Sequence, residues 1–538
     1  MAEEKAKFEM NWDDLLSSRR QRPSSSDSND FDGRNAFEKD YHRIILSASF
    51  RRLQDKTQVF PLDQSDFVRT RLTHSLEVSS IAKSLGAKTS SMLSQSSYKN
   101  VPSLEQSKEI ADLLLCAGLL HDMGNPPFGH YGETTIRNYY KSNLPELTYK
   151  DLPLTNYLDE QMQQDLYHFE GNAQVIRLVT KLHYLVDEHG MNLSYGLLNT
   201  LMKYPVNSTK VDANSEDARY RKLGYFLAES ELFQDITEAT GTRKPANTQG
   251  RILASDLPVT NSAKPRDNTV KQLSFAPDIG EEEVVRHPLT YLLEAADDIS
   301  YSTADLEDAS RKGNISYIEL EDYLKSSLRR DKLSPELRTA YDDLVDKLNH
   351  CLEDAKEKHA EKASLYAIQN WVIHVQSALI QSVSETYVDN YQAIMRGEYI
   401  SDLFNNNLAG VVIDVLGDLA YDFVFSTQYI VGLEVAADTI ITWLLEKFVP
   451  AIINYDTKIE QKPVERRLVA LISDNYRESY HHQAEVISDK YRESYHHEAE
   501  CKIEREKLYL RLCLVNDYVC GMTDSFARDL YHKFNGIS

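Results

Sequence analysis

The stretch ADLLLCAGLLHDMGNPPFGHYGE, residues 111–133, decides the class of fold. Residues 110–120 are apolar almost all round, which predicts a helix that is buried on every side. His121 and Asp122 stand at the C-terminal end of this helix, where Gly124 can terminate it and the following proline pair prevents its continuation. Because a buried His–Asp pair is costly unless it is paired or binds a metal ion, we expect a polar site at this turn.

Two further segments supply residues of the same kind. His74 lies in RTRLTHSLEVSSIAKSLG, and Asp297 and Asp298 lie in PLTYLLEAADDISYSTADLEDA, both with helical spacing. Two histidines and two aspartates without a cysteine would form a mixed nitrogen and oxygen site, unlike a typical structural zinc site. Such a set suits Mn²⁺, Fe²⁺, Mg²⁺ or Ni²⁺, with positions left for water and substrate. The alternative is a set of capped or salt-bridged polar residues between packed helices.

Helical spacing runs through most of the chain. Apolar residues recur at three- and four-residue intervals and strand-like alternation is rare, so we predict an all-α fold. The segments with this spacing are 108–121, 170–187, 288–308, 365–385 and 408–448. Residues 240–285 differ, because four prolines and three glycines there predict a long irregular excursion with room for a short hairpin.

A tandem repeat occupies residues 472–501. The sequence ISDNYRESYHHQAEV recurs almost unchanged as ISDKYRESYHHEAEC, with a period of 15 residues. Two short copies indicate a local duplication that lengthens a helix or a loop, since stacked repeat folds need at least three longer units. We interpret the four histidines of the repeat as solvated residues rather than a metal-binding tract: His481, His482, His496 and His497.

Composition excludes several classes of protein. The 538 residues carry 60 Lys and Arg against 83 Asp and Glu, a net charge of −23, which argues against a general nucleic-acid coat. A polyanionic substrate stays compatible if a local basic pocket, ideally with a metal ion, receives it. No apolar run approaches a membrane span, and the N-terminus MAEEKAKFEMNWDD predicts no secretory signal. Five scattered cysteines without a CxxC pair are typical of the reducing cytoplasm.

The order H…HD…D resembles that of the HD phosphohydrolase superfamily. The sequence around these residues is more specific, and from about Trp12 to the C-terminus it resembles the deoxyguanosinetriphosphate triphosphohydrolase (dGTPase) family. The matching words are FRRLQDKTQVFPL (50–62), RTRLTHSLEV (69–78), HDMGNPPFGHYGE (121–133), FEGNAQVIRL (169–178), EAADDISYSTADLEDA (294–309) and DYVCGMTDSFARDLY (517–531). The duplication and the details of 240–285 follow no family pattern.

This resemblance implies an HD-type helical metal-dependent phosphohydrolase fold. We expect a flexible N-terminal lead-in at 1–35, a catalytic core at 36–310, and a C-terminal helical region at 311–538 packed on the core. The resemblance implies that the metal ligands are His74, His121, Asp122 and Asp297. Asp297 is preferred over its neighbour Asp298 because the family's ligand is the first acid after the alanine.

The resemblance also implies that His130 and Glu133 form the catalytic pair. Spacing supports this, because positions i and i+3 share a face if a helix begins at residue 130, so Glu133 can orient the imidazole. The alternative for His130 is a helix-capping role.

Asp297, Tyr301 and Asp305 are spaced i, i+4, i+8 and form a nearly straight row on a helix. The resemblance implies that Tyr301 packs on the deoxyribose and that Asp305 binds the 3′-hydroxyl together with Gln58. A ring at C2′ would exclude a ribose by its bulk. The alternative is that Tyr301 belongs to the hydrophobic face of an amphipathic helix.

Positive charge for a triphosphate has several candidate sources. Arg71 lies one turn before His74 on the same helical face, and Lys203 lies in the word LMKYP. The family's KxGYF word makes Lys222 the better candidate, and Asn172 is a further substrate-binding candidate. A plain solvated charge is the alternative for each of them.

The predicted activity is hydrolysis of dGTP, or another dNTP, to deoxynucleoside and tripolyphosphate with Mn²⁺ or Mg²⁺, and with Fe²⁺ or Ni²⁺ as alternatives. The rival interpretations are an HD phosphodiesterase acting on another nucleotide, and a nucleic-acid- or nucleotide-responsive oligomer with a vestigial site. By resemblance we expect a homo-oligomer, a hexamer in the first instance. Single-stranded DNA or a nucleotide is a candidate effector, and the location expected is the cytoplasm, with no membrane association.

Overall fold

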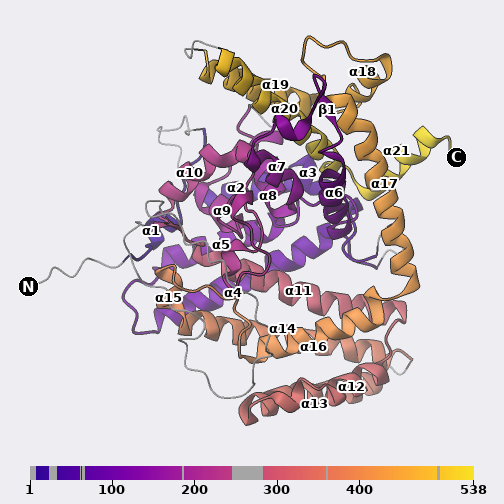
Figure 1. Cartoon of the computed structure of the whole chain (residues 1–538). Coiled ribbons are helices and arrows are strands. Elements are labelled where there is room, and N and C mark those ends of the chain that lie inside the picture. Colours follow the sequence, from indigo (N-terminus) through magenta and orange to yellow (C-terminus); the bar gives the residue numbers. More distant parts are fainter. Residues whose placement is uncertain are drawn as a thin grey trace, which may run out of the picture.

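The computed structural model describes residues 8–22, 33–60, 62, 67–183, 187–244, 283–358, 361–492 and 497–537 (Figure 1). Helices dominate these ranges, which confirms the all-α prediction. The helices up to residue 239 are α1 (Trp12–Leu15), α2 (Ala36–Ile45), α3 (Ala48–Arg52), α4 (Arg71–Ser94), α5 (Leu104–Leu120), α6 (His130–Asn143), α7 (Glu160–Tyr167), α8 (Gly171–Arg177), α9 (Tyr195–Leu201) and α10 (Ser230–Ala239).

The second half of the chain continues in the same way. Its helices are α11 (Pro288–Lys312), α12 (Tyr317–Ser326), α13 (Pro335–Lys358), α14 (Ala363–Asp389), α15 (Tyr391–Met395), α16 (Leu408–Ala420), α17 (Gln428–Ile452), α18 (Pro463–Val469), α19 (Asp474–Lys490), α20 (His497–Cys520) and α21 (Asp524–Asn535). Two antiparallel strand pairs accompany them: β1 (Thr148–Tyr149) with β2 (Leu152–Pro153), and β3 (Arg243–Lys244) with β4 (Glu283–Val284).

The helix pair α4 and α5 forms the centre of the core. Helix α5 begins with a capping box at Ser103 and ends at Leu120, so that His121 is its C-cap residue, as the apolar run predicted. The two helices approach closely because residue 118 is glycine: a Cβ there would lie 2.5 Å from Cα of Ser79. This close approach brings the His121 ring to 5.3 Å from the ring of His74, measured between centroids.

Helix α11 crosses this pair in the middle of the molecule (Figure 1). It begins with Pro288 in its first turn and ends at Gly313, whose φ of 78° is the left-handed conformation that glycine adopts without strain. It packs on α4 and α5, and also on α14 and α16. The predicted boundary between the catalytic core and the C-terminal helical region, at residue 310, stays a prediction. Helix α11, which ends near this boundary, packs on helices of both predicted regions.

The predicted helix at 408–448 is two helices. Helix α16 passes into a π-helical turn, η9 (Tyr421–Phe425), where the first helix ends. A new helix, α17, begins after Thr427, whose side chain accepts from the N–H of Ile430. Apolar spacing continues through the break, which is why periodicity alone did not reveal it. The segment predicted at 170–187 also ends early: α8 passes into a π-helical turn that ends at Leu182.

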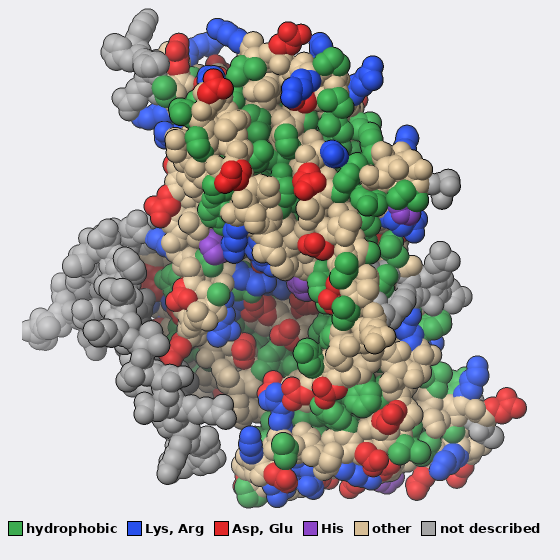
Figure 2. Space-filling view, turned by 45° about the vertical axis from the view of Figure 1, so that its right-hand side comes forward, with side chains coloured by type: hydrophobic (Ala, Val, Ile, Leu, Met, Phe, Trp, Pro, Cys, Tyr) green, Lys and Arg blue, Asp and Glu red, His purple; other side chains and the backbone are tan. Residues whose placement is uncertain are grey.

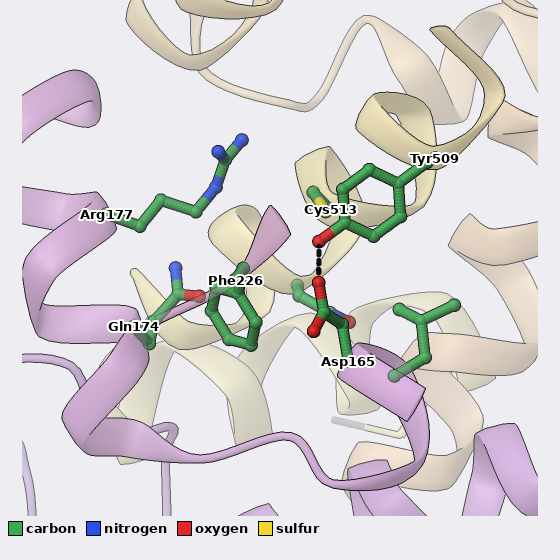
Figure 3. A pocket seen from close by; sticks show the side chains of 8 residues that line it. Asp165, Gln174, Arg177, Phe226, Tyr509 and Cys513 are labelled. Atoms are coloured by element: carbon green, nitrogen blue, oxygen red, sulfur yellow. Dashed lines mark hydrogen bonds between the residues drawn. The ribbon is translucent and has the colours of Figure 1, made fainter. Parts of the chain in front are cut away.

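A buried polar seam joins the C-terminal helices to the core (Figure 3). Arg177 of α8 pairs with Asp517 of α20 at 2.8 Å and with Glu229 at 2.9 Å. Beside them, Tyr509 and Asp165 line a small cavity, and the Tyr509 hydroxyl donates to the Asp165 carboxylate at 2.5 Å (Figure 3). Burial raises the pKa of the Asp165 carboxyl to about 7.

The chain ends and excursions depart in part from expectation. Within the predicted lead-in, residues 8–22 are packed rather than free, because Met10, Trp12 and Leu15 are apolar and buried. Trp12 also donates to the Tyr391 hydroxyl at 2.7 Å. Residues 1–7 and 23–32 of the lead-in, residues 245–282 of the predicted excursion, and His496 lie outside the described residues. Across the described ranges, no helix is long and apolar enough to span a membrane.

Candidate metal and phosphoryl-transfer site

Three helices bring the four predicted metal ligands together. His74 comes from α4, His121 and Asp122 from the end of α5, and Asp297 from the middle of α11. The ligand atoms of His74, His121 and Asp122 lie within 4.8 Å of one another. Asp297 Oδ1 lies 3.2 Å from Nε2 of His74 and 3.4 Å from Nε2 of His121, so it faces both imidazoles.

The two ring nitrogens of His121 have different surroundings. Nδ1 lies 2.8 Å from the carbonyl oxygen of Gly118, which can only accept, so Nδ1 carries the proton. Nε2 is the nitrogen that faces the carboxylates of Asp122 and Asp297, and it is buried without a close hydrogen-bond partner among the described residues. In the neutral imidazole Nε2 has a lone pair, so these residues fit a divalent metal ion between them.

His130 and Glu133 occupy the first turn of α6, as the spacing predicted. His130 Nδ1 lies 2.9 Å from Oε2 of Glu133. The hydrogen bond and the charge of Glu133 raise the pKa of His130 above its ordinary value of 6.5. Burial raises the pKa of Glu133, but the hydrogen bond and the charge of His130 outweigh it and lower that pKa to about 2. Glu133 is buried and also accepts from the N–H of Gly171, whereas His130 is exposed and can meet a substrate.

Arg71 takes a different partner from the one expected. Its guanidinium is buried and pairs with Asp122, one of the predicted metal ligands. It also packs against Gly129, where a Cβ would lie 2.3 Å from Nη2, so only glycine allows this approach. Arg71 Nε has no partner among the described residues and stays available to a phosphate oxygen. Lys203 similarly lies 3.2 Å from Oδ2 of Asp297.

Glu170 is a site residue that sequence reasoning missed. Its buried carboxylate accepts from Nζ of Lys222 at 3.0 Å and from Nδ2 of Asn172 at 2.9 Å. Burial, with the nearby charge of Glu133, raises the pKa of Glu170, and Lys222 opposes this. Glu170 thus orients both predicted phosphate-binding side chains. The signal that could have found it is its place in the family word FEGNAQ.

The predicted sugar-binding residues lie along α11 and beside it. Tyr301 stacks on Phe425 of η9, with ring centroids 6.3 Å apart and planes inclined by 6°. Asp305, one turn further, is buried, and burial raises the pKa of its carboxyl well above the ordinary value. Asp305 Oδ2 and Gln58 Oε1 are buried oxygens without a partner in the described part of the chain. Each of these two oxygens is suited to accept from one ligand hydroxyl.

The surface is hollowed on one face, where basic, acidic and histidine side chains gather (Figure 2). At the predicted site, Arg71 pairs with Asp122, Lys203 with Asp297 and Lys222 with Glu170. A site with both signs of charge can accept a triphosphate together with a cation.

Comparisons with known proteins identify the family of the chain. The HD domain family matches residues 71–179. A deoxyguanosinetriphosphate triphosphohydrolase-like protein of Listeria monocytogenes is 41% identical, over 98% of this chain and 100% of the relative. A probable deoxyguanosinetriphosphate triphosphohydrolase of Pseudomonas aeruginosa is 30% identical over 93% of each chain. A deoxyguanosinetriphosphate triphosphohydrolase of Yersinia enterocolitica is 28% identical over 95% of this chain and 96% of its own length.

The helical frame, the histidine–aspartate cluster and the matched domain define a metal-dependent phosphohydrolase of the HD class. Relatives that cover nearly the whole chain narrow this class to nucleotide triphosphohydrolases. The chain belongs to the deoxyguanosinetriphosphate triphosphohydrolase family.

Proposed function

We propose that this protein hydrolyses deoxynucleoside triphosphates to deoxynucleoside and tripolyphosphate, with dGTP the favoured substrate. The observation that carries the proposal is the His130–Glu133 pair, which begins nine residues after His121 in the same stretch of sequence. An exposed imidazole on a buried carboxylate is suited to proton transfer at a bound substrate. The names of the relatives supply the preference for dGTP.

The proposed reaction breaks the bond between the α-phosphorus and O5′ of the deoxyribose. The oxygen of a water molecule bonds to phosphorus, and its proton passes to solvent. His130, whose pKa Glu133 raises, donates its Nε2 proton to O5′ from its protonated form and regains a proton from solvent. The leaving deoxynucleoside is then neutral, and the phosphates depart as tripolyphosphate.

The predicted ligands His74, His121, Asp122 and Asp297 would hold a divalent cation, Mn²⁺ or Mg²⁺, with Fe²⁺ or Ni²⁺ as alternatives. Such an ion supplies Lewis-acid charge next to the α-phosphate. The nearby cations Arg71, Lys203 and Lys222 would hold the phosphate chain and offset its charge as the bond breaks. Asp122 and Asp297 are each bound to one of these cations, which orients the carboxylates before a metal arrives.

A panel of the four dNTPs and GTP, each with Mn²⁺ and with Mg²⁺, tests the proposal by direct detection of tripolyphosphate. We expect tripolyphosphate and deoxynucleoside in equal amounts, fastest from dGTP. Release of pyrophosphate, or turnover of cyclic nucleotides alone, would instead support the phosphodiesterase interpretation. No turnover of any nucleotide with either metal would support a vestigial site.

The assembly and its effector are separate proposals. We propose a homo-oligomer, a hexamer by family resemblance, located in the cytoplasm. Light scattering at working concentration measures the mass, and a monomer would reject the oligomer. Single-stranded DNA or a second nucleotide, added to the dNTP assay, tests for an effector by a change in rate.

A further inference from the structure

Asp524 is a buried carboxylate at the start of α21, far from the HD core in sequence. Its Oδ1 accepts from the backbone N–H of Phe128 at 2.9 Å, and its Oδ2 accepts from the N–H of Thr57 at 2.9 Å. Both donors stand beside predicted site residues: Gln58 follows Thr57, and His130 lies two residues after Phe128. One side chain therefore joins the backbones of two segments that carry the site.

The turn that Asp524 contacts is strained. Phe128 has a φ of 62° and Gly129 a φ of 61°, so two consecutive residues have a positive φ immediately before His130. Glycine does this without penalty, but phenylalanine does not. A bulky residue stays in this region only when its surroundings determine it. The buried Phe128 ring and the bond from its N–H to Asp524 provide that determination.

Lys56 strengthens the same junction from the other side. Its buried Nζ donates to the carbonyl oxygens of Asn125 and Cys520, each at 2.6 Å. Its own carbonyl oxygen accepts from the N–H of Arg71 at 2.9 Å. The segment at Thr57, the turn at Phe128 and the corner between α20 and α21 therefore form one polar junction.

A simpler role for Asp524 is to cap its own helix. Thr523 already has that role, because its side chain accepts from the N–H of Phe526. Both oxygens of Asp524 are used on other segments instead, over separations of 396 and 467 residues. Capping therefore does not account for the buried carboxylate.

We propose that Asp524 is a positioning residue for the proposed hydrolysis: it sets the backbone in front of His130 and the backbone beside Gln58 at the same time. The inference rests on the proposed function, because His130 and Gln58 take their roles from it. Asp524 does not touch the substrate, so it acts only through the groups that it holds. A C-terminal helix thereby holds two N-terminal segments of the site, at Thr57 and at Phe128, in place.

The test compares Asp524→Asn with Asp529→Asn, an exposed carboxylate on the same helix. Asparagine keeps the shape of the aspartate side chain, but its NH₂ group would face one of the two backbone N–H donors, that of Phe128 or that of Thr57. We expect Asp524→Asn to lower kcat at least tenfold and to raise KM, with metal content unchanged, whereas Asp529→Asn stays within twofold of wild type. An Asp524→Asn enzyme as active as Asp529→Asn overturns the proposal.

A double variant separates positioning from general loss of structure. In a His130→Ala background, Asp524→Asn should lower the remaining kcat by less than twofold, because the group through which it acts on kcat is already gone, whereas the rise in KM, which comes through Gln58, should persist. An equal tenfold loss in both backgrounds would mean that Asp524 does not act through His130.

A measurement on the unmodified protein tests the hydrogen bonds of Asp524 to Thr57 and Phe128 even if the variant does not fold. Residue-resolved amide hydrogen exchange should find the N–H groups of Thr57 and Phe128 as protected as those in the middle of α5. Rapid exchange at either amide overturns the proposal. This result does not depend on turnover, so a protein inactive on every dNTP would reject the proposed function while exchange still tested Asp524.

Discussion

Nδ1 of His121 donates to the carbonyl oxygen of Gly118 at 2.8 Å, within the last turn of α5, and this contact fixes Nε2 as the nitrogen that faces the site. The same glycine permits the close approach of α4 that places His74 beside it. One residue thus determines both the spacing of the two imidazoles and the tautomer of one of them. The relative placement of the two predicted histidine ligands therefore depends on how α4 and α5 pack.

We therefore expect His121→Ala to lose both bound metal and activity. The ligand that remains on α5, Asp122, is already paired with Arg71 and cannot compensate alone. Metal content by elemental analysis should fall in parallel with tripolyphosphate release, while His482→Ala, an exposed histidine in the duplicated segment, should change neither. Full activity with full metal content in His121→Ala would refute the ligand assignment.

Glu133→Gln should move the alkaline limb of the pH–rate profile to lower pH. The hydrogen bond and the charge of Glu133 raise the pKa of His130 above 6.5. If protonated His130 is the proton donor, activity falls as pH rises through that pKa. Glutamine removes the charge, lowers the pKa of His130 and brings the fall to lower pH. The measurement is kcat/KM against pH, with the exposed Glu146→Gln as control; an unshifted limb would contradict the role of His130 as donor.

Glu170→Ala should act mainly on substrate binding. Lys222 and Asn172 both lose the partner that orients them, which removes about one hydrogen bond to a charged group. We expect KM to rise about tenfold with kcat changed far less. Steady-state kinetics with dGTP measure this, beside the exposed Glu160→Ala. A loss confined to kcat would place Glu170 with the proton-transfer pair rather than with the phosphates.

Arg177→Met should destabilise the whole fold. It leaves the buried carboxylates of Asp517 and Glu229 without their cation, which typically costs about 3–5 kcal/mol. Arg329→Met is the matched control, because Arg329 also pairs with two carboxylates but lies exposed, where such pairs contribute about 0–1 kcal/mol. Denaturant unfolding measures both, and similar losses for the two variants would contradict the importance of burial.

Local pattern was enough to predict the fold near the site. The apolar run of α5, with glycine and prolines after it, correctly placed its end at His121 and left room for α6 to begin at His130. It was not enough for residues 408–448, because the break before α17 depends on capping by Thr427 and not on any change in apolar spacing. Helix existence follows periodicity, whereas helix boundaries depend on single polar contacts.

Some of the residues at the site could be predicted from the sequence and others could not. The predicted ligands could be found because His74 and Asp297 lie on helices with regular apolar spacing, and His121 and Asp122 follow directly on the end of another. Glu170 and Asp524 escaped notice since neither has helical spacing to another site residue. Tertiary packing alone brings Glu170 to Lys222, and Asp524 to Phe128. Both stand inside family-specific words, FEGNAQ and GMTDSF, and that was the available signal.

Discrimination between sugars should depend on the bulk of Tyr301. The ring lies one helical turn from Asp297 and parallel to the ring of Phe425, which restricts its movement away from an added 2′-hydroxyl. Asp305 and Gln58, by contrast, present buried acceptors that suit the 3′-hydroxyl common to both sugars. Bulk and hydrogen bonding thus have separable effects on substrate choice.

Tyr301→Ala should therefore narrow the ratio of kcat/KM between dGTP and GTP, even as the overall rate falls. Tyr301→Phe keeps the ring and should keep the preference, which makes it the matched control. Asp305→Ala should weaken dGTP and GTP alike, and should affect 3′-deoxy analogues least. All three variants are compared by tripolyphosphate release from each nucleotide. If Tyr301→Ala loses activity but retains the full deoxy preference, sugar selection lies elsewhere and the row on α11 is only core packing.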